Sequence, residues 1–193
     1  MAYSSHKILS IALLMLISVP SSLGRPQKSE TETDLRDLCS NTRKPKQCWK
    51  IIKPQLSSFD VTDSRSVAGA VIDLAVAKAQ EIHDKLNQLF QDSRDDKLKE
   101  KYISCSKNYN DANRNLDLAK RNLDSNDYQN IPVQVDDTLE ELKSCRHEFD
   151  KDSFDPAHIK NRNKEFGVYV DIVKVATDRL LREDDRLQEN ARH

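Results

Sequence analysis

Glycine is scarce in this chain of 193 residues, which has three glycines, and only Gly69 and Gly167 lie beyond residue 24. The same region has no strand-like segment of alternating apolar and polar residues that ends in an Asn-Gly or Asp-Gly hairpin turn. Tight turns between strands depend on residues that tolerate positive φ. The composition therefore predicts a nearly all-α protein.

Long apolar runs are also missing, with one exception at the N-terminus. Residues 8–19 form an apolar run that follows the basic Lys7 and precedes the small Gly24. This run is too short for the roughly 20 residues of a membrane-spanning helix, which argues against the alternative of a retained anchor. Its pattern predicts a secretory signal peptide at 1–24, and a single secreted domain at 25–193 with no membrane association after cleavage.

No excess of charge of one sign is present. The chain has 31 Lys and Arg against 32 Asp and Glu, and the two signs are interspersed along its whole length. A nucleic-acid binder needs a clustered basic face that releases counterions from phosphates. The charge pattern therefore argues against nucleic acid as a partner and indicates a solvated surface.

Recognisable catalytic patterns are absent as well. The sequence has no Gly-x-Ser-x-Gly, no Gly-rich phosphate loop and no His-Glu-x-x-His. Adjacent acids on a helix point in different directions, so the paired acids do not form a glycosidase site by themselves. We therefore predict no enzyme activity and no cofactor. The scattered histidines and paired acids are His83, His147, His158, His193, Asp95-Asp96, Asp136-Asp137 and Asp184-Asp185.

Four segments carry apolar residues at helical spacing. They cover 64–92, about 95–125, about 132–149, and a segment from after Pro156 to about 187. Amphipathic helices joined by short polar turns bury their apolar faces most simply in an antiparallel four-helix bundle, which we place at 64–188. A coiled-coil fibre is the alternative, but turn signals separate the segments. A carrier of apolar ligands would need an open cavity, and large residues along each seam argue against one.

A different segment precedes the bundle. In residues 33–56, Pro45 and Pro54 interrupt the helical pattern, which predicts a hairpin of short helices. Helices this short are marginal in water, so something must hold them. The polar stretch 25–34 is predicted to fray.

Four cysteines lie in the secreted region, at positions 39, 48, 105 and 145. Secreted chains meet an oxidising environment, so two disulfides are expected, and four half-cystines allow three pairings. A bridge between Cys39 and Cys48 would hold the hairpin and would leave Cys105 and Cys145, which both lie on apolar seams. Zinc is the alternative use of these thiols, but no two cysteines are two to four residues apart, so we predict no metal site.

Several motifs resemble those of the plant invertase and pectin methylesterase inhibitors. The hairpin is similar to a Cys-x2-Thr-x2-Pro-x2-Cys pattern, and the helical segment at about 95–125 to a Cys-x3-Tyr-x2-Ala-x3-Leu-x2-Ala pattern. A Cys-x3-Phe pattern and the sequence RNKEF at 162–166 complete the likeness. The matching residues are Cys39, Thr42, Pro45, Cys48, Cys105, Tyr109, Ala112, Leu116, Ala119, Cys145 and Phe149.

This resemblance implies a four-helix bundle with a disulfide-stapled N-terminal helical hairpin, in which Cys39 pairs with Cys48 and Cys105 with Cys145. It also implies an inhibitor, secreted to the plant cell wall or apoplast, that docks stoichiometrically on a protein partner. That partner is an invertase, which is a β-fructosidase that cleaves sucrose, or a pectin methylesterase. The rival interpretation is a non-inhibitory secreted interaction protein of the pollen or defence type that keeps this fold.

The invertase-directed members present a Pro-Lys-Phe element before the last helix, and this chain has KDSFDPAHIKN at 151–161 instead. Within this loop an aromatic side chain among charges could anchor a partner, although Phe154 could instead cover the end of the bundle. The candidate partner-binding residues are Phe154, Pro156, His158 and Lys160. A second candidate is the exposed face with Lys85, Gln88, Lys99, Lys107 and Arg114, for which a merely solvated surface is the alternative.

Overall fold

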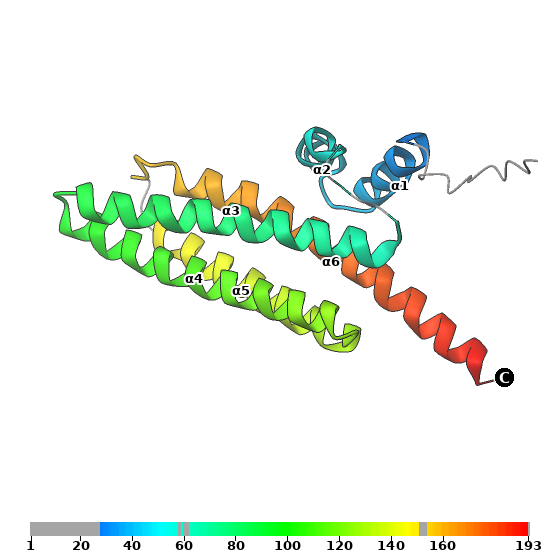
Figure 1. Cartoon of the computed structure of the whole chain (residues 1–193). Coiled ribbons are helices and arrows are strands. Elements are labelled where there is room, and N and C mark those ends of the chain that lie inside the picture. Colours follow the sequence, from blue (N-terminus) through cyan, green and yellow to red (C-terminus); the bar gives the residue numbers. More distant parts are fainter. Residues whose placement is uncertain (1–27, 58, 60–61, 151–153, 193) are drawn as a thin grey trace, which may run out of the picture.

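The computed structural model describes residues 28–192 apart from 58, 60, 61 and 151–153. The predicted signal peptide at 1–24 lies outside the described residues. The described part of the chain is built from helices and contains no strand (Figure 1). The prediction of an all-α protein is thus confirmed.

Four long helices form the body of the molecule. They are α3 (Ser64–Asp92), α4 (Asp96–Asp124), α5 (Ile131–Asp150) and α6 (Ile159–Ala191). Each packs against the next, and α3 also packs against α6, which closes a four-helix bundle (Figure 1). The four helices agree with the predicted segments. Helix α6 extends beyond the predicted end near Leu187 by one exposed turn.

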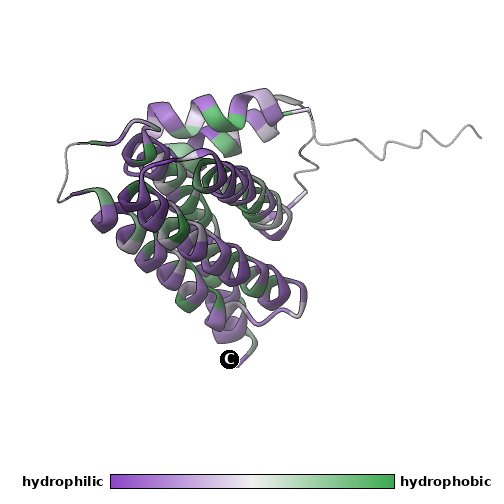
Figure 2. Ribbon diagram, turned by 90° about the vertical axis from the view of Figure 1, so that its left-hand side faces the viewer, coloured by the Kyte–Doolittle hydropathy of each residue, from purple (hydrophilic) through white to green (hydrophobic). Residues whose placement is uncertain are grey.

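The core of the bundle follows the predicted seams. Its largest fully buried side chains include Tyr109, Phe149 and Phe166, and the Tyr109 and Phe166 rings lie 5.3 Å apart between centroids. Hydrophobic residues face the interior between the helices, and hydrophilic residues cover the outside (Figure 2). Burial of this continuous apolar stripe is what stabilises helices of such polar composition.

Local signals define where these helices begin. Asp63 and Ser66 form a reciprocal capping box at the start of α3, and Asp95 accepts a hydrogen bond from the Leu98 N–H at the start of α4. These bonds satisfy N–H groups that have no partner within the helix. The short 3₁₀ helix η2 (Tyr128–Asn130) leads into α5.

The hairpin precedes the bundle and consists of α1 (Lys28–Ser40), α2 (Pro45–Ile52) and the 3₁₀ helix η1 (Lys53–Gln55). Pro45 is the first residue of α2, where its missing N–H costs nothing. A disulfide joins Cys39 to Cys48, with 5.4 Å between their Cα atoms. Both helices contact α6, so the hairpin lies against one side of the bundle (Figure 1).

The predicted fraying of 25–34 is wrong from Lys28 onward, because α1 already begins there. Two contacts explain the longer helix. Glu32 accepts a charged hydrogen bond of 2.8 Å from Arg36 one turn later, and the Arg36 guanidinium stacks 3.9 Å over the Trp49 ring of α2. The second contact is between helices, so local polarity alone could not reveal it.

Candidate partner-binding surfaces

The loop residues 154–158, which directly precede α6, lie at the end of the bundle where α3 turns into α4 (Figure 1). Phe154 is 56% exposed, Pro156 and His158 are also exposed, and Lys160 is partly buried. The structure therefore brings the four predicted candidate residues to one end of the molecule. More than half of the surface of Phe154 is accessible to solvent.

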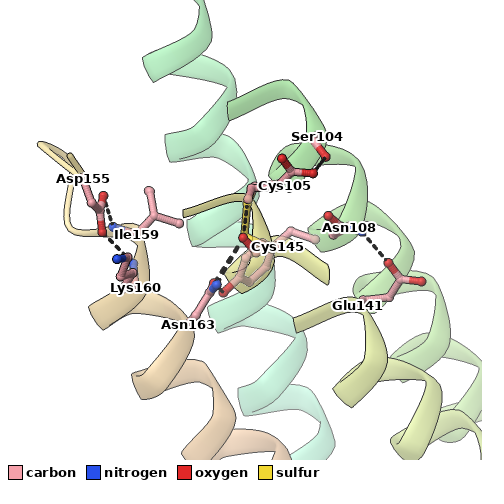
Figure 3. Close-up of a disulfide and its surroundings, with 11 residues drawn as sticks. Ser104, Cys105, Asn108, Glu141, Cys145, Asp155, Ile159, Lys160 and Asn163 are labelled. Atoms are coloured by element: carbon pink, nitrogen blue, oxygen red, sulfur yellow. Dashed lines mark hydrogen bonds between the residues drawn. A yellow bond between two sulfur atoms is a disulfide. The ribbon is translucent and has the colours of Figure 1, made fainter. Parts of the chain in front are cut away.

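Hydrogen bonds fix residues 155–160 at the start of α6. The Asp155 carboxylate accepts hydrogen bonds from the backbone N–H groups of Ile159, at 2.8 Å, and Lys160, at 2.9 Å (Figure 3). These are N–H groups at the start of α6 that have no partner within the helix. His158 has a left-handed backbone with φ of 55°, which non-glycine residues rarely adopt. Sequence reasoning missed the role of Asp155, although an acid shortly before an amphipathic segment is a capping signal.

The interior behind the loop is cross-linked. A disulfide joins Cys105 of α4 to Cys145 of α5, with 4.6 Å between their Cα atoms. Asn163 of α6 donates a hydrogen bond to the Cys145 sulfur at 3.3 Å (Figure 3). The side-chain oxygen of Asn163 accepts a hydrogen bond from the Tyr109 hydroxyl at 2.7 Å. Burial raises the pKa of Tyr109, so this hydroxyl stays a donor. Three helices are thereby fixed relative to one another directly beneath the loop.

The second predicted surface spreads over α3 and α4. Lys85 donates a hydrogen bond to Gln88 at 3.0 Å, and Arg114 pairs with Asp111 at 3.2 Å. These groups are satisfied within the face, as in an ordinary solvated surface. One feature that sequence reasoning missed is Ile103, which is 47% exposed and lies one turn before Lys107.

A third surface was not predicted from the sequence. A groove of about 440 Å³ lies between the start of α2, the middle of α5 and the first half of α6. Basic side chains surround it and aliphatic side chains form its floor. Its lining residues are Arg43, Lys44, Leu139, Leu142, Lys143, Arg146, Asn163, Lys164, Gly167, Val168 and Asp171.

The paired acids have structural roles. Asp95 caps α4, Asp136 pairs with Lys174 at 3.3 Å, and Asp185 accepts a hydrogen bond from Gln129. Within the part of the chain that the structure describes, no three His, Cys, Asp or Glu side chains gather as they would around a metal ion. The part of this disulfide-linked bundle that is available for contacts with another molecule is therefore its outer surface.

The fold and these surfaces define a disulfide-braced helical bundle of the kind that acts by binding. A family model described as plant invertase/pectin methylesterase inhibitor matches residues 33–179. The chain belongs to this family, which is one of inhibitors and not of enzymes.

Two relatives of this chain are named as pectinesterase inhibitors. The chain is 27% identical over 179 residues to "Pectinesterase inhibitor" of Actinidia deliciosa, a match that covers 92% of this chain and 95% of the relative. It is 23% identical over 162 residues to "Pectinesterase inhibitor 2" of Arabidopsis thaliana, covering 83% and 88% respectively. The chain therefore spans nearly the whole length of both proteins.

Solved structures show the same fold. The chain is similar to a mutant form of a pectin methylesterase inhibitor from Arabidopsis, with a TM-score of 0.66 and 23% identity, over 77% of this chain and 95% of that one. A second structure of such an inhibitor from Arabidopsis thaliana has a TM-score of 0.57 and 22% identity, over 76% and 95%. The hairpin and the bundle are thus an established architecture.

Proposed function

We propose that this protein is a secreted inhibitor of pectin methylesterase that docks stoichiometrically on the enzyme. The observation that carries the proposal is the likeness to relatives named pectinesterase inhibitors, which extends over 92% of the chain in the first case. No cofactor or turnover is required for this role, because a rigid surface that covers the enzyme is sufficient. Rigidity itself favours tight binding, since little conformational freedom is lost on docking.

One further observation favours pectin methylesterase over invertase as the target. The loop before α6 has Phe154-Asp155-Pro156-Ala157-His158, and it has no Pro-Lys-Phe element of the kind that invertase-directed inhibitors present. Asp155 is also committed to capping α6.

The loop end supplies part of the docking surface in this proposal. Phe154 and Pro156 are exposed apolar groups, with His158 beside them and Lys160 at the start of α6. Binding energy in protein interfaces concentrates in a few such residues, and aromatic side chains are frequent among them. The Asp155 cap fixes the start of α6 immediately after Phe154.

Secretion into the apoplast completes the proposal. It depends on the signal peptide predicted at 1–24 and agrees with two disulfides, which persist in oxidising compartments. None of the described helices has the length and apolar character needed to cross a membrane.

The test is a titration of the oxidised protein, residues 25–193, against a plant pectin methylesterase and separately against a cell-wall invertase at mildly acidic pH. We expect esterase activity to fall linearly to an end point at one inhibitor per enzyme, with invertase unaffected. Inhibition of invertase alone would reassign the target. If micromolar protein inhibits neither enzyme, the rival interpretation of a non-inhibitory interaction protein replaces ours.

The docking surface has its own test. Phe154→Ala should weaken esterase inhibition about tenfold or more, the usual cost of truncating an aromatic anchor. Leu187→Ala is the matched control, because Leu187 is an even more exposed apolar group, at 69%, near the C-terminal end of α6, far from the loop (Figure 1). Equal effects of the two substitutions would remove the loop from the interface.

A further inference from the structure

The groove between the hairpin, α5 and α6 has an unusual concentration of positive charge. Five of its lining residues are basic and come from three separate parts of the chain. The turn before α2 contributes two of them, α5 two and α6 one. These residues are Arg43, Lys44, Lys143, Arg146 and Lys164, which we call the basic rim.

Three of the five side chains of the basic rim have an acidic partner, and two of these pairs are exposed to solvent. Among the described residues, the only acid that lines the groove is Asp171, whose side chain is 8% exposed. Its carboxylate accepts two hydrogen bonds of 2.8 Å, one from the Arg43 backbone N–H and one from Arg43 Nε. Lys143 pairs with Glu140, and Arg146 lies 3.7 Å from Asp150, but the side chains of these pairs are half exposed or more. Exposed pairs are weak and exchange readily for another carboxylate.

Gly167 opens the floor of the groove. It lies in the interior of α6, where glycine is a poorer helix former than alanine. A Cβ added at this position would meet only the Leu142 side chain, at the ordinary contact distance of 3.8 Å. Helix packing therefore does not demand a glycine here, whereas a ligand that approaches the α6 backbone would.

We propose that the groove binds an anionic oligosaccharide of uronate units, with its carboxylates on the basic rim and a sugar face on the floor at Gly167. The proposal rests on the proposed function, since removal of methyl esters from pectin leaves such carboxylates. The inhibitor would then be retained on pectin that its target has already demethylated. Carboxylates of this kind are ionised at mildly acidic pH.

An acidic peptide fits the groove less well. Peptides in grooves are held by apolar side chains that enter pockets along the path. Of the three aliphatic side chains that line the groove, Leu142 is 8% and Val168 is 3% exposed, which leaves Leu139 as the one partly exposed apolar group for this purpose. Recognition must depend on charge spread along the rim, and a chain with one carboxylate on each unit matches that distribution.

The experiment measures binding of an oligogalacturonate of about ten units by calorimetry, with no enzyme present. We expect binding that weakens as salt is added, because the rim charges are exposed. The same oligosaccharide in its fully methyl-esterified form should not bind. A poly-glutamate of equal charge is the third probe, and tighter rim-dependent binding of poly-glutamate would overturn the proposal in favour of an acidic protein partner.

Variants locate the site. Lys143→Ala, Arg146→Ala and Lys164→Ala together should lower affinity about tenfold or more, as expected for three lost exposed ion pairs. The control combines Lys107→Ala, Arg114→Ala and Arg121→Ala on the exposed face of α4, which removes the same charge and should change affinity less than about twofold. Equal loss in both triple variants would show that only net charge matters, and would refute a specific groove.

Gly167→Leu blocks the floor without changing charge. It should lower affinity as much as the rim variant does, while helical content and the melting temperature stay at the level of Gly167→Ala. Unchanged affinity in a folded Gly167→Leu protein would refute the floor contact. The rim variant should still inhibit esterase on a soluble substrate. If the unmodified protein inhibits the esterase but does not bind the oligosaccharide, this inference alone is overturned. If the unmodified protein does not inhibit the esterase, the proposed function is overturned.

Discussion

The N-terminal hairpin and the four-helix bundle are stabilised in different ways. In the bundle every helix packs against two others, around a continuous core that includes Tyr109, Phe149 and Phe166. In the hairpin α1 and α2 pack on each other and on α6, and bury a small set of side chains led by Leu35, Leu38 and Ile52. The bundle is stable through its core, whereas the hairpin depends on a few specific links.

Four links hold the hairpin, and one of them is the stacking of Arg36 of α1 over the Trp49 ring of α2. The Cys39–Cys48 disulfide joins its two helices, Asp171 of α6 binds Arg43 in the turn between them, and Arg179 of α6 lies 3.4 Å from Asp37 of α1. Regions with few buried contacts open at lower free energy than the core. We infer that the hairpin can loosen while the bundle stays folded, and the following substitutions test that difference.

The largest effect is expected in the bundle core. Phe166→Ala should lower the free energy of unfolding by about 3–5 kcal/mol, because it leaves a cavity beside the buried Tyr109 ring. Urea denaturation followed by far-UV circular dichroism measures this loss. Phe154→Ala is the control and should change stability by less than about 0.5 kcal/mol, since Phe154 is 56% exposed. A loss below about 1 kcal/mol for Phe166→Ala would contradict a core of this importance.

Removal of the hairpin disulfide should come next. Cys39→Ser with Cys48→Ser opens a loop of sequence separation 9, worth about 3 kcal/mol in the chain-entropy model. We expect amide exchange to accelerate in α1 and α2 and to remain slow in α3 to α6. The paired experiment removes Cys105 and Cys145, with a separation of 40 and about 4 kcal/mol, and should accelerate exchange throughout the bundle. The same exchange pattern in both double variants would contradict two separately stabilised regions.

A smaller effect is expected where the hairpin meets α6. Asp171→Ala should cost about 1–3 kcal/mol, since it deprives the Arg43 backbone N–H and Nε of their acceptor. Arg43→Ala keeps the backbone bond but leaves the buried Asp171 carboxylate with one donor fewer, so its cost should lie below that of Asp171→Ala without vanishing. Limited proteolysis in the hairpin reports both changes. Equal sensitivity of the two variants would show that the backbone hydrogen bond contributes nothing.

The two regions also differ in how far the sequence predicted them. The bundle helices follow from apolar spacing, because long amphipathic segments have one simple burial solution. The structure has the disulfide pairing that the family resemblance implies, which cysteine count alone left open among three. Links between distant segments could not be predicted, as the Arg43–Asp171 contact shows, since its partners are 128 residues apart.

The candidate surfaces illustrate the same limit. Phe154 and its neighbours are contiguous in sequence, so the loop could be predicted as one surface. The basic rim is assembled from positions 43–44, 143–146 and 164. Acids lie close in sequence to the second and third of these segments, whereas no acid lies between Asp37 and Asp60 around the first. Neither α5 nor α6 reads as basic along the chain, and only their packing beside the hairpin brings the five basic side chains to one groove.

The smallest effect is expected at the helix cap where the bundle begins. Hydrogen bonds from the Ser66 backbone and side chain hold the pKa of Asp63 below its ordinary value of 3.8. Asp63 therefore stabilises the fold fully at pH values above 3.8, and this contribution disappears as pH falls through the lowered pKa. Asp63→Ala should cost about 1 kcal/mol at pH 6 and less at pH 2. Asp63→Asn is the control, because an uncharged cap should keep most of the stability at both pH values. A cost of Asp63→Ala that is the same at pH 6 and pH 2 would show that the carboxylate charge has no part in starting α3.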